Sequence, residues 1–171
     1  EETEKLIICH LGNGSSLSAV KDGKVVDTSM GLTPLEGVVM GTRCGSIDPA
    51  IIYYIMKQDK ISIEEVDTLL NKKSGLLGLT GLSSDMRDVR SAAEAGNEDA
   101  ITALKIWAYV IRKQIGAYAA AMDGVDTLVF TAGIGENDAQ ARADICDGLS
   151  FLGIALDHEK NSAVRGVEAC I

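Results

Sequence analysis

Residues 10–16 read HLGNGSS, and this glycine-rich stretch decides how the fold begins. An apolar run, Leu6–Cys9, comes directly before it, and a second alternating run, Leu17–Val20, comes directly after it. Two strands joined by glycines and small hydroxyl residues predict a hairpin whose turn exposes backbone N–H groups. Phosphate oxygens suit such a turn, because it is rich in donors and free of bulky side chains.

A second glycine-rich stretch follows a later strand. Residues 127–131 read TLVFT and predict a short strand, and residues 132–137 read AGIGEN. We interpret the second stretch as a loop, with Asn137 as the cap of a helix that reaches about Asp147. A glycine pair between a strand and a helix allows a nucleotide to lie against the backbone. Two such loops, each after a strand, predict a nucleotide held between them.

The order of the elements predicts an α/β fold. A third strand is expected over residues 24–28, joined to the second through the tight-turn pair Asp22-Gly23. Three antiparallel strands, then helices, then a strand and a helix are the order of one lobe of a ribonuclease H-like fold, as in actin-like ATPases. The expected architecture is a mixed sheet that starts with three antiparallel strands and is flanked by helices. A dinucleotide-binding fold is excluded, because its first glycine run leads into a helix rather than a strand.

Capping residues and apolar spacing predict the helices. Asn97 caps the longest one, which ends at Asp123-Gly124, and Trp107 lies off its main apolar stripe. Residues 76–82 are expected to form a loop. An earlier helix begins at Asp48-Pro49. Its expected buried stripe consists of Ile51, Ile52, Ile55 and Met56.

The composition is that of an ordinary globular core, with 46% hydrophobic and 24% charged residues in 171, a length that fits one domain or one lobe. The net charge of −9 argues against a nucleic-acid partner, whose binding surface would be basic. The four cysteines lack any metal-type spacing, and we expect free thiols in a reducing cytoplasm. Neither a signal peptide nor a membrane-length apolar run is present, so no membrane partner is expected.

The ends of the sequence are unusual. The chain starts at Glu1 without a methionine and reaches a strand within a few residues, and it stops at Cys170-Ile171 without a terminal capping signal. We therefore expect a piece of a longer polypeptide, with processing of a precursor as the alternative.

Two side chains near the first turn are candidates for chemistry on a phosphoryl group. Arg43 lies in Gly41-Thr42-Arg43-Cys44-Gly45, where small neighbours allow a ligand to approach and the planar guanidinium can bind phosphate or carboxylate. During phosphoryl transfer such a cation stabilises charge on the equatorial oxygens. His10 precedes the turn, and its imidazole and the carboxamide of Asn13 can both bind a phosphoryl oxygen. The alternatives are a packed strand-end histidine and a simple turn residue.

The remaining polar candidates are less distinctive. Asp85, Met86 and Arg87 lie at a helix start, where capping by the aspartate and a solvated arginine fit as well as ligand binding. The helical arginines are expected to lie on solvated faces: Arg90, Arg112 and Arg142. Walker, protein-kinase, serine-hydrolase and zinc-site signatures are absent from the sequence.

Together these stretches resemble the acetate kinases, the acetokinase family of the actin-like phosphotransferase superfamily. The likeness runs nearly from end to end in the expected order. It is carried by residues 10–19 (HLGNGSSLSA) with Gly23, 27–37 (DTSMGLTPLEG), 41–49 (GTRCGSIDP), 83–88 (SSDMRD) and 131–137 (TAGIGEN).

The resemblance implies reversible transfer of the γ-phosphoryl group of ATP to acetate, giving acetyl phosphate and ADP, with Mg²⁺. It implies that Arg43 stabilises the transferred phosphoryl group and that His10 supports it, which makes these two the catalytic residues. It also implies a homodimer formed through this lobe. The residues that it implies for nucleotide binding are His10, Gly12, Asn13, Gly14, Asp85, Met86, Arg87, Gly133, Ile134, Gly135, Glu136 and Asn137.

Two departures from the family pattern affect these expectations. Asp138 stands where the family usually has a serine, which would change a helix cap. The family's N-terminal lobe and C-terminal end have no counterpart here, so Mg²⁺ ligands are expected mainly outside this chain and no metal ligand is assigned within it. We expect residues 1–171 to be a single nucleotide-side lobe, truncated at both ends and inactive alone.

Other activities remain as alternatives at this stage. Propionate and butyrate kinases are close relatives, so the acceptor is acetate or another short carboxylate. A nucleotide-binding or dimerising module without turnover is a second alternative. A sugar kinase or heat-shock-type ATPase fits less well, because those relatives lack the Gly-Thr-Arg-Cys-Gly run.

Overall fold

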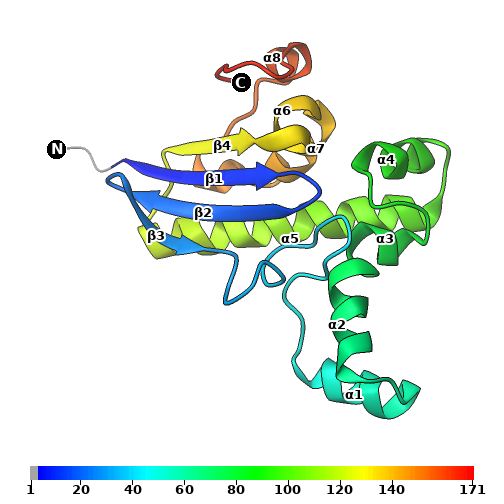
Figure 1. The fold of residues 1–171 in the computed structure, drawn as a ribbon. Coiled ribbons are helices and arrows are strands. Elements are labelled where there is room, and N and C mark those ends of the chain that lie inside the picture. The colour runs from blue at the N-terminus through cyan, green and yellow to red at the C-terminus, as the bar shows by residue number, and fades with distance from the viewer. Residues whose placement is uncertain (1–3) are drawn as a thin grey trace.

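The computed structural model describes residues 4–171, which form a four-stranded sheet flanked by helices (Figure 1). The sheet has the spatial order β3-β2-β1-β4, in which β1, β2 and β3 are antiparallel neighbours and β4 runs parallel to β1. The strands are β1 (Lys5–Leu11), β2 (Ser15–Lys21), β3 (Lys24–Thr28) and β4 (Thr127–Thr131). This arrangement confirms the predicted mixed sheet that starts with three antiparallel strands.

The turn between β1 and β2 is shorter than the sequence pattern predicts. His10 pairs with Ser16 and Leu11 pairs with Ser15, so both residues belong to β1 and the turn is left with residues 12–14. The candidate histidine, His10, therefore lies within β1, and Leu11 separates it from the turn.

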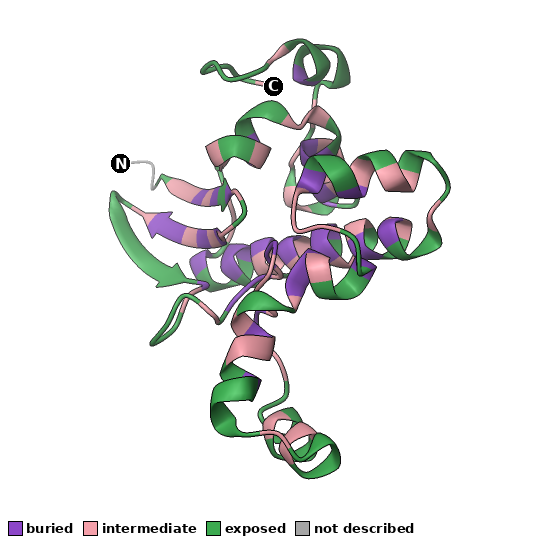
Figure 2. Ribbon diagram, turned by 45° about the vertical axis from the view of Figure 1, so that its right-hand side comes forward, coloured by how far each residue is buried: buried purple, intermediate pink, exposed green. Residues whose placement is uncertain are grey.

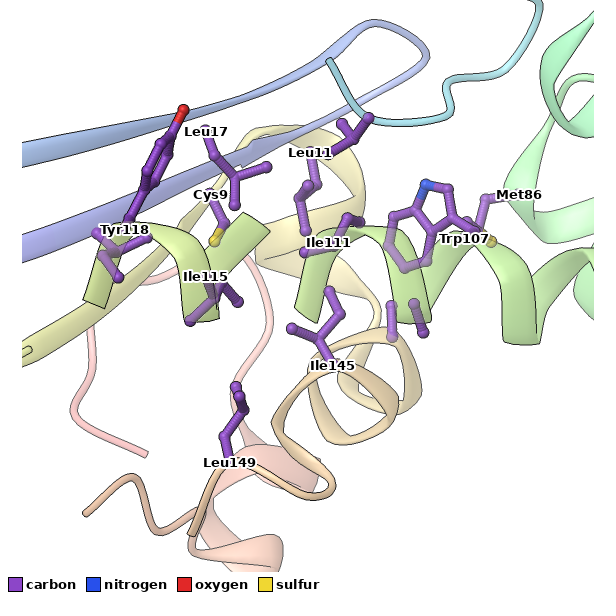
Figure 3. Packing of buried hydrophobic residues seen from close by; sticks show 14 of the residues in the cluster. Cys9, Leu11, Leu17, Met86, Trp107, Ile111, Ile115, Tyr118, Ile145 and Leu149 are labelled. Carbon is purple, nitrogen blue, oxygen red and sulfur yellow. The ribbon is translucent and has the colours of Figure 1, made fainter. Parts of the chain in front are cut away.

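Helix α5 (Glu98–Met122) lies across one face of the sheet and organises the hydrophobic core (Figure 3). As predicted, Asn97 caps it, with its side-chain oxygen accepting a hydrogen bond from Ala100 N at 2.9 Å. Trp107, which we expected off the main stripe, is 2% exposed and belongs to the core, because α3 and α4 cover that part of α5 as well as the sheet. The other core side chains labelled in Figure 3 are Cys9, Leu11, Leu17, Met86, Ile111, Ile115, Tyr118, Ile145 and Leu149.

The remaining helices are α1 (Ala50–Asp59), α2 (Ile63–Lys72), α3 (Gly75–Thr80), α4 (Met86–Glu94), α6 (Ala132–Asn137), α7 (Ala139–Cys146) and α8 (His158–Ala163), with a 3₁₀ turn at Ser150–Leu152. Helices α1 and α2 extend away from the sheet, and most of α1 is exposed (Figures 1 and 2). The buried stripe predicted for α1 is wrong, because none of the residues of α1 is buried. Helix α1 packs against α2, and this contact leaves its apolar side chains at least partly exposed.

Two stretches that were expected to be loops are helical. Residues 75–80 form α3, and the second glycine run forms α6. The cap of α7 is Asp138 rather than Asn137, since Asp138 Oδ1 accepts a hydrogen bond from Ala141 N at 2.9 Å. Aspartate at this position thus performs the capping function that a serine would perform.

The part of the chain that the structure describes offers no helix with both the length and the apolar character that a membrane crossing requires.

Candidate functional site

A cleft of about 760 Å³ opens where the two glycine runs meet, more than 100 residues apart in the sequence. Its walls come from the β1–β2 turn, from α4, from α6 with the start of α7, and from the segment after α8. This volume suits a ligand of the size of a nucleotide. The wall residues are Gly12, Asn13, Ser84, Asp85, Met86, Arg87, Arg90, Ser91, Glu94, Gly133, Ile134, Asn137, Asp138, Ala139 and Arg165.

The β1–β2 turn is held in place by its own bonds and by the loop that carries Arg43. Gly12 N donates to Gly14 O at 3.1 Å, and the Asn13 carbonyl accepts a hydrogen bond from Gly41 N at 2.9 Å. A Cβ on Gly41 would collide with Asn13 Oδ1 and would come within 2.9 Å of Ser84 O. Gly41 therefore has to be glycine so that Asn13 and Ser84 can both line the cleft.

Arg43 lies beside this turn, next to the cleft wall. A Cβ on Gly14 would lie 3.4 Å from Arg43 Nη1, so the guanidinium occupies the space that a side chain at Gly14 would need. Nη1 donates to Pro34 O at 3.2 Å and approaches Met40 Sδ at 3.3 Å. The loop is anchored by α3, where Leu76 N donates to Met40 O at 2.9 Å. The structure thus places Arg43 beside the glycine turn, although Arg43 is not among the residues that line the cleft.

His10 lies at the end of β1, in register with Thr131 at the end of β4. Its Nδ1 is 2.9 Å from Thr131 Oγ1, which is hydrogen-bonding distance. Thr131 precedes α6, and its hydroxyl makes no capping bond to that helix. The Thr131 hydroxyl thus orients the imidazole, and the second ring nitrogen of His10 forms no hydrogen bond with residues 4–171.

The two glycines of the second run have different surroundings. Gly133 lines the cleft, and a Cβ on it would meet nothing within 4 Å. Gly135 is buried, and a Cβ on it would lie 3.3 Å from the Phe130 carbonyl carbon. Glu136 Oε1 accepts a hydrogen bond from Ala132 N at 2.9 Å. Of the residues implied for nucleotide binding, the structure leaves four outside the cleft wall: His10, Gly14, Gly135 and Glu136.

The opposite wall begins with an ion pair at the N-terminus of α4. Asp85 caps the helix and accepts a hydrogen bond from Arg87 N at 2.9 Å. The Arg87 side chain also bonds Asp85 through Nε at 3.0 Å and Nη2 at 2.6 Å. These bonds lower the pKa of the Asp85 carboxyl to about 2, so it is ionised at neutral pH.

The arginines expected on solvated faces are engaged in packing instead. Arg142 is 2% exposed, and its guanidinium donates to Gly135 O at 2.9 Å, Asn161 Oδ1 at 2.6 Å and Val164 O at 3.1 Å. Arg90 Nε donates to Asp138 Oδ2 at 3.0 Å and joins the two cleft walls. The prediction failed because these acceptors belong to distant segments, which the periodicity of one helix does not report. Arg112 likewise donates, through Nη2, to the backbone oxygen of Asp144 at 2.5 Å.

Comparisons with known proteins show which family and which solved structures the chain is similar to. The family model described as "Acetokinase family" matches residues 1–171. An acetate kinase of Thermoanaerobacterium thermosaccharolyticum is 61% identical over 171 residues, and one of Lachnoclostridium phytofermentans is 58% identical over 167 residues. The alignments cover 99% and 98% of this chain, and the chain spans 42% of the length of each of these relatives.

Solved structures show the same likeness. An acetate kinase from Porphyromonas gingivalis superposes with a TM-score of 0.95 at 45% identity, covering 98% of this chain and 42% of that one. A propionate kinase from Francisella tularensis superposes with a TM-score of 0.90 at 47% identity, covering 95% of this chain and 42% of that one.

Proposed function

The chain belongs to the acetokinase family, and from this premise we propose that it is the nucleotide-side lobe of an acetate kinase. The proposed reaction is the reversible transfer of the γ-phosphoryl group of ATP to acetate, giving acetyl phosphate and ADP. The observation that carries the proposal is the convergence of both glycine runs on one cleft, with Arg43 beside the first of them.

The cleft suggests how a nucleotide would lie. Helix α6 starts next to the β1–β2 turn, where a Cβ on Gly12 would lie 3.8 Å from Ala132 Cβ, and it ends at Asn137. Backbone N–H groups and the Asn13 carboxamide suit phosphate oxygens, so the phosphates would occupy the Gly12 end. The ribose and the base would then lie between α4 and α6, flanked by Asp85, Met86 and Arg87 on one side and by Gly133, Ile134 and Asn137 on the other.

Arg43 would supply the charge that phosphoryl transfer needs. Its assigned bonds all leave from Nη1, so the remaining guanidinium donors are available to equatorial oxygens of the transferred group. His10, held at Nδ1 by Thr131, would contribute its other ring nitrogen to the same group. In-line transfer requires mainly positioning and charge neutralisation, which these two residues provide.

Mg²⁺ is part of the proposed reaction as the usual companion of ATP. Residues 4–171 contain no group of three or more His, Cys, Asp or Glu side chains arranged to hold a metal ion. Two carboxylates of the cleft already bind arginines, Asp85 with Arg87 and Asp138 with Arg90. We therefore assign no metal ligand within this chain and derive no step through the ion.

A different short carboxylate is the second candidate acceptor, because one of the similar solved structures is a propionate kinase. We also propose a homodimer and a cytoplasmic location. Exposed aromatic side chains on α1, Tyr53 at 76% and Tyr54 at 69%, support the dimer, since such side chains suit an interface.

The proposed function is tested with the full-length protein by trapping acyl phosphate with hydroxylamine. ATP with acetate, propionate and butyrate should all be compared, and acetate should give the highest kcat/KM. Failure to form any acyl hydroxamate would overturn the kinase assignment. Calorimetry with residues 1–171 alone should detect ADP binding without turnover, and turnover by this chain alone would contradict its assignment as one lobe.

A further inference from the structure

Three arginines line the cleft, and they differ in what they bind. Arg87 pairs with Asp85, and Arg90 pairs with Asp138. Arg165 lines the same cleft from the segment after α8, and it forms no ion pair or side-chain hydrogen bond with any of residues 4–171. An uncommitted guanidinium in a ligand-sized cleft has all its donors and its planar face free for a ligand.

The backbone on both sides of Arg165 is fixed, before it to α7 through Val164 and after it to α6 through Gly166. Arg142 Nη2 donates to Val164 O at 3.1 Å, and Gly166 N donates to Glu136 O at 3.2 Å. The segment follows α8 and lies next to α6 (Figure 1). Because its neighbours are anchored, Arg165 loses little backbone entropy when its side chain meets a ligand.

The position along α6 indicates which part of a nucleotide Arg165 would meet. Gly166 approaches Asn137, since a Cβ on it would lie 3.5 Å from Asn137 Oδ1. Asn137 ends α6, whereas Ala132 at its start adjoins Gly12, and five helical steps separate the two by about 8 Å. If the phosphates occupy the Gly12 end, the base occupies the Arg165 end.

We propose that Arg165 is a further ligand-contact residue whose guanidinium stacks on the face of the nucleotide base. This inference rests on the proposed function, because it uses the same orientation of the nucleotide. A planar, weakly hydrated guanidinium stacks well on aromatic faces, and purines offer a larger face than pyrimidines. Arg165 would therefore favour purine over pyrimidine nucleotides while leaving the phosphoryl chemistry unaffected.

The test compares kinetic constants of full-length variants with ATP and UTP, which carry identical phosphates. For Arg165→Ala we expect KM for ATP to rise roughly 2- to 30-fold, the range of a cation–π contact, with kcat unchanged. The rise for UTP should be smaller, so the ratio of kcat/KM for ATP to that for UTP should fall. Lys160→Ala removes an exposed charge from α8 outside the cleft and serves as the matched control. In this variant KM for ATP, KM for UTP and the ratio of the two kcat/KM values should all stay unchanged.

Two results would overturn the inference. An unchanged KM for ATP in Arg165→Ala would mean that the side chain does not touch the nucleotide. An equal rise for ATP and UTP would mean that it binds the shared phosphates or ribose instead of the base. A wild-type protein without ATP-dependent turnover would overturn the proposed function itself, which separates the two failures.

Discussion

Each glycine run of the cleft is accompanied by one arginine, and the two arginines differ in what their guanidinium groups already bind. Arg43, beside Gly14, is half-buried, and its assigned bonds leave from Nη1 alone. Arg142, which binds the Gly135 carbonyl, is 2% exposed and makes four hydrogen bonds to carbonyl and carboxamide oxygens. The structure thus leaves donors of Arg43 free for a ligand, whereas most donors of Arg142 hold α6, α7 and the α8 region together.

The largest expected effect is on turnover, from the arginine with free donors. Arg43→Ala in the full-length enzyme should lower kcat by roughly 10³-fold or more, because a positioned guanidinium stabilises the charge of the transferred phosphoryl group. ADP affinity should change only modestly. Hydroxamate trapping measures kcat and calorimetry measures ADP affinity. Arg43→Lys, which keeps the charge but not the planar fork, should restore only part of the rate. A large loss of ADP affinity at unchanged kcat would contradict this role.

Arg142, whose guanidinium is hydrogen-bonded within the fold, should affect stability more than turnover. Arg142→Met leaves buried carbonyl groups without donors, and the free energy of unfolding should fall by about 3 kcal/mol. Urea denaturation of the full-length protein, followed by circular dichroism, measures the change. Lys160→Met, at an exposed site, should leave the unfolding free energy within about 0.5 kcal/mol of the wild type. The same small change for Arg142→Met would remove the distinction between the two arginines.

The glycines of the second run provide a finer comparison. Gly133→Val projects its side chain into the cleft and should weaken ADP binding by about 1–3 kcal/mol, roughly 5- to 150-fold, with little loss of stability. Gly135→Val meets Phe130 and should instead lower the free energy of unfolding by about 1–3 kcal/mol. Calorimetry and urea denaturation on both variants give the comparison. Normal ADP binding by Gly133→Val would count against the cleft as the nucleotide site.

The smallest expected effect concerns the hydrogen bond that orients His10. Thr131→Val removes the hydroxyl at nearly constant shape and should raise the activation free energy by about 0.5–1.5 kcal/mol, which lowers kcat roughly 2- to 12-fold. Thr131→Ser, which keeps the hydroxyl, should restore the rate. If the serine variant is as impaired as the valine variant, the hydroxyl is not what matters at this position.

Local signals accounted for much of the fold. The pair Asp22-Gly23 predicted a turn, and both residues have positive φ, at 51° and 73°. Asn97 was predicted as a cap and accepts the expected backbone bond. These features depend on a few consecutive residues, so the sequence reports them directly. The glycine content of residues 132–137 was a weaker signal, because it predicted a loop where the structure has helix α6.

Long-range contacts could not be predicted in the same way. Periodicity placed Arg142 on a solvated face, yet its acceptors lie in α6 and near α8, where short-range patterns give no information. The α1 stripe failed for a related reason, since apolar spacing shows that a helix has an apolar face but not what covers it. Gly41 stood in a motif, but its closeness to Asn13 and Ser84 is visible only in three dimensions.

The sequence by itself determined the order of the four strands, the long helix α5, the turn between β1 and β2, and membership of the acetokinase family, because these properties depend on short runs of neighbouring residues. Only the tertiary structure decided that Gly133 faces the cleft while Gly135 faces the core, that Thr131 holds His10, and that Arg165 reaches the cleft while Arg142 does not. The physical reason is that burial and hydrogen-bond partnership depend on which distant segments pack together, and packing is a property of the whole chain.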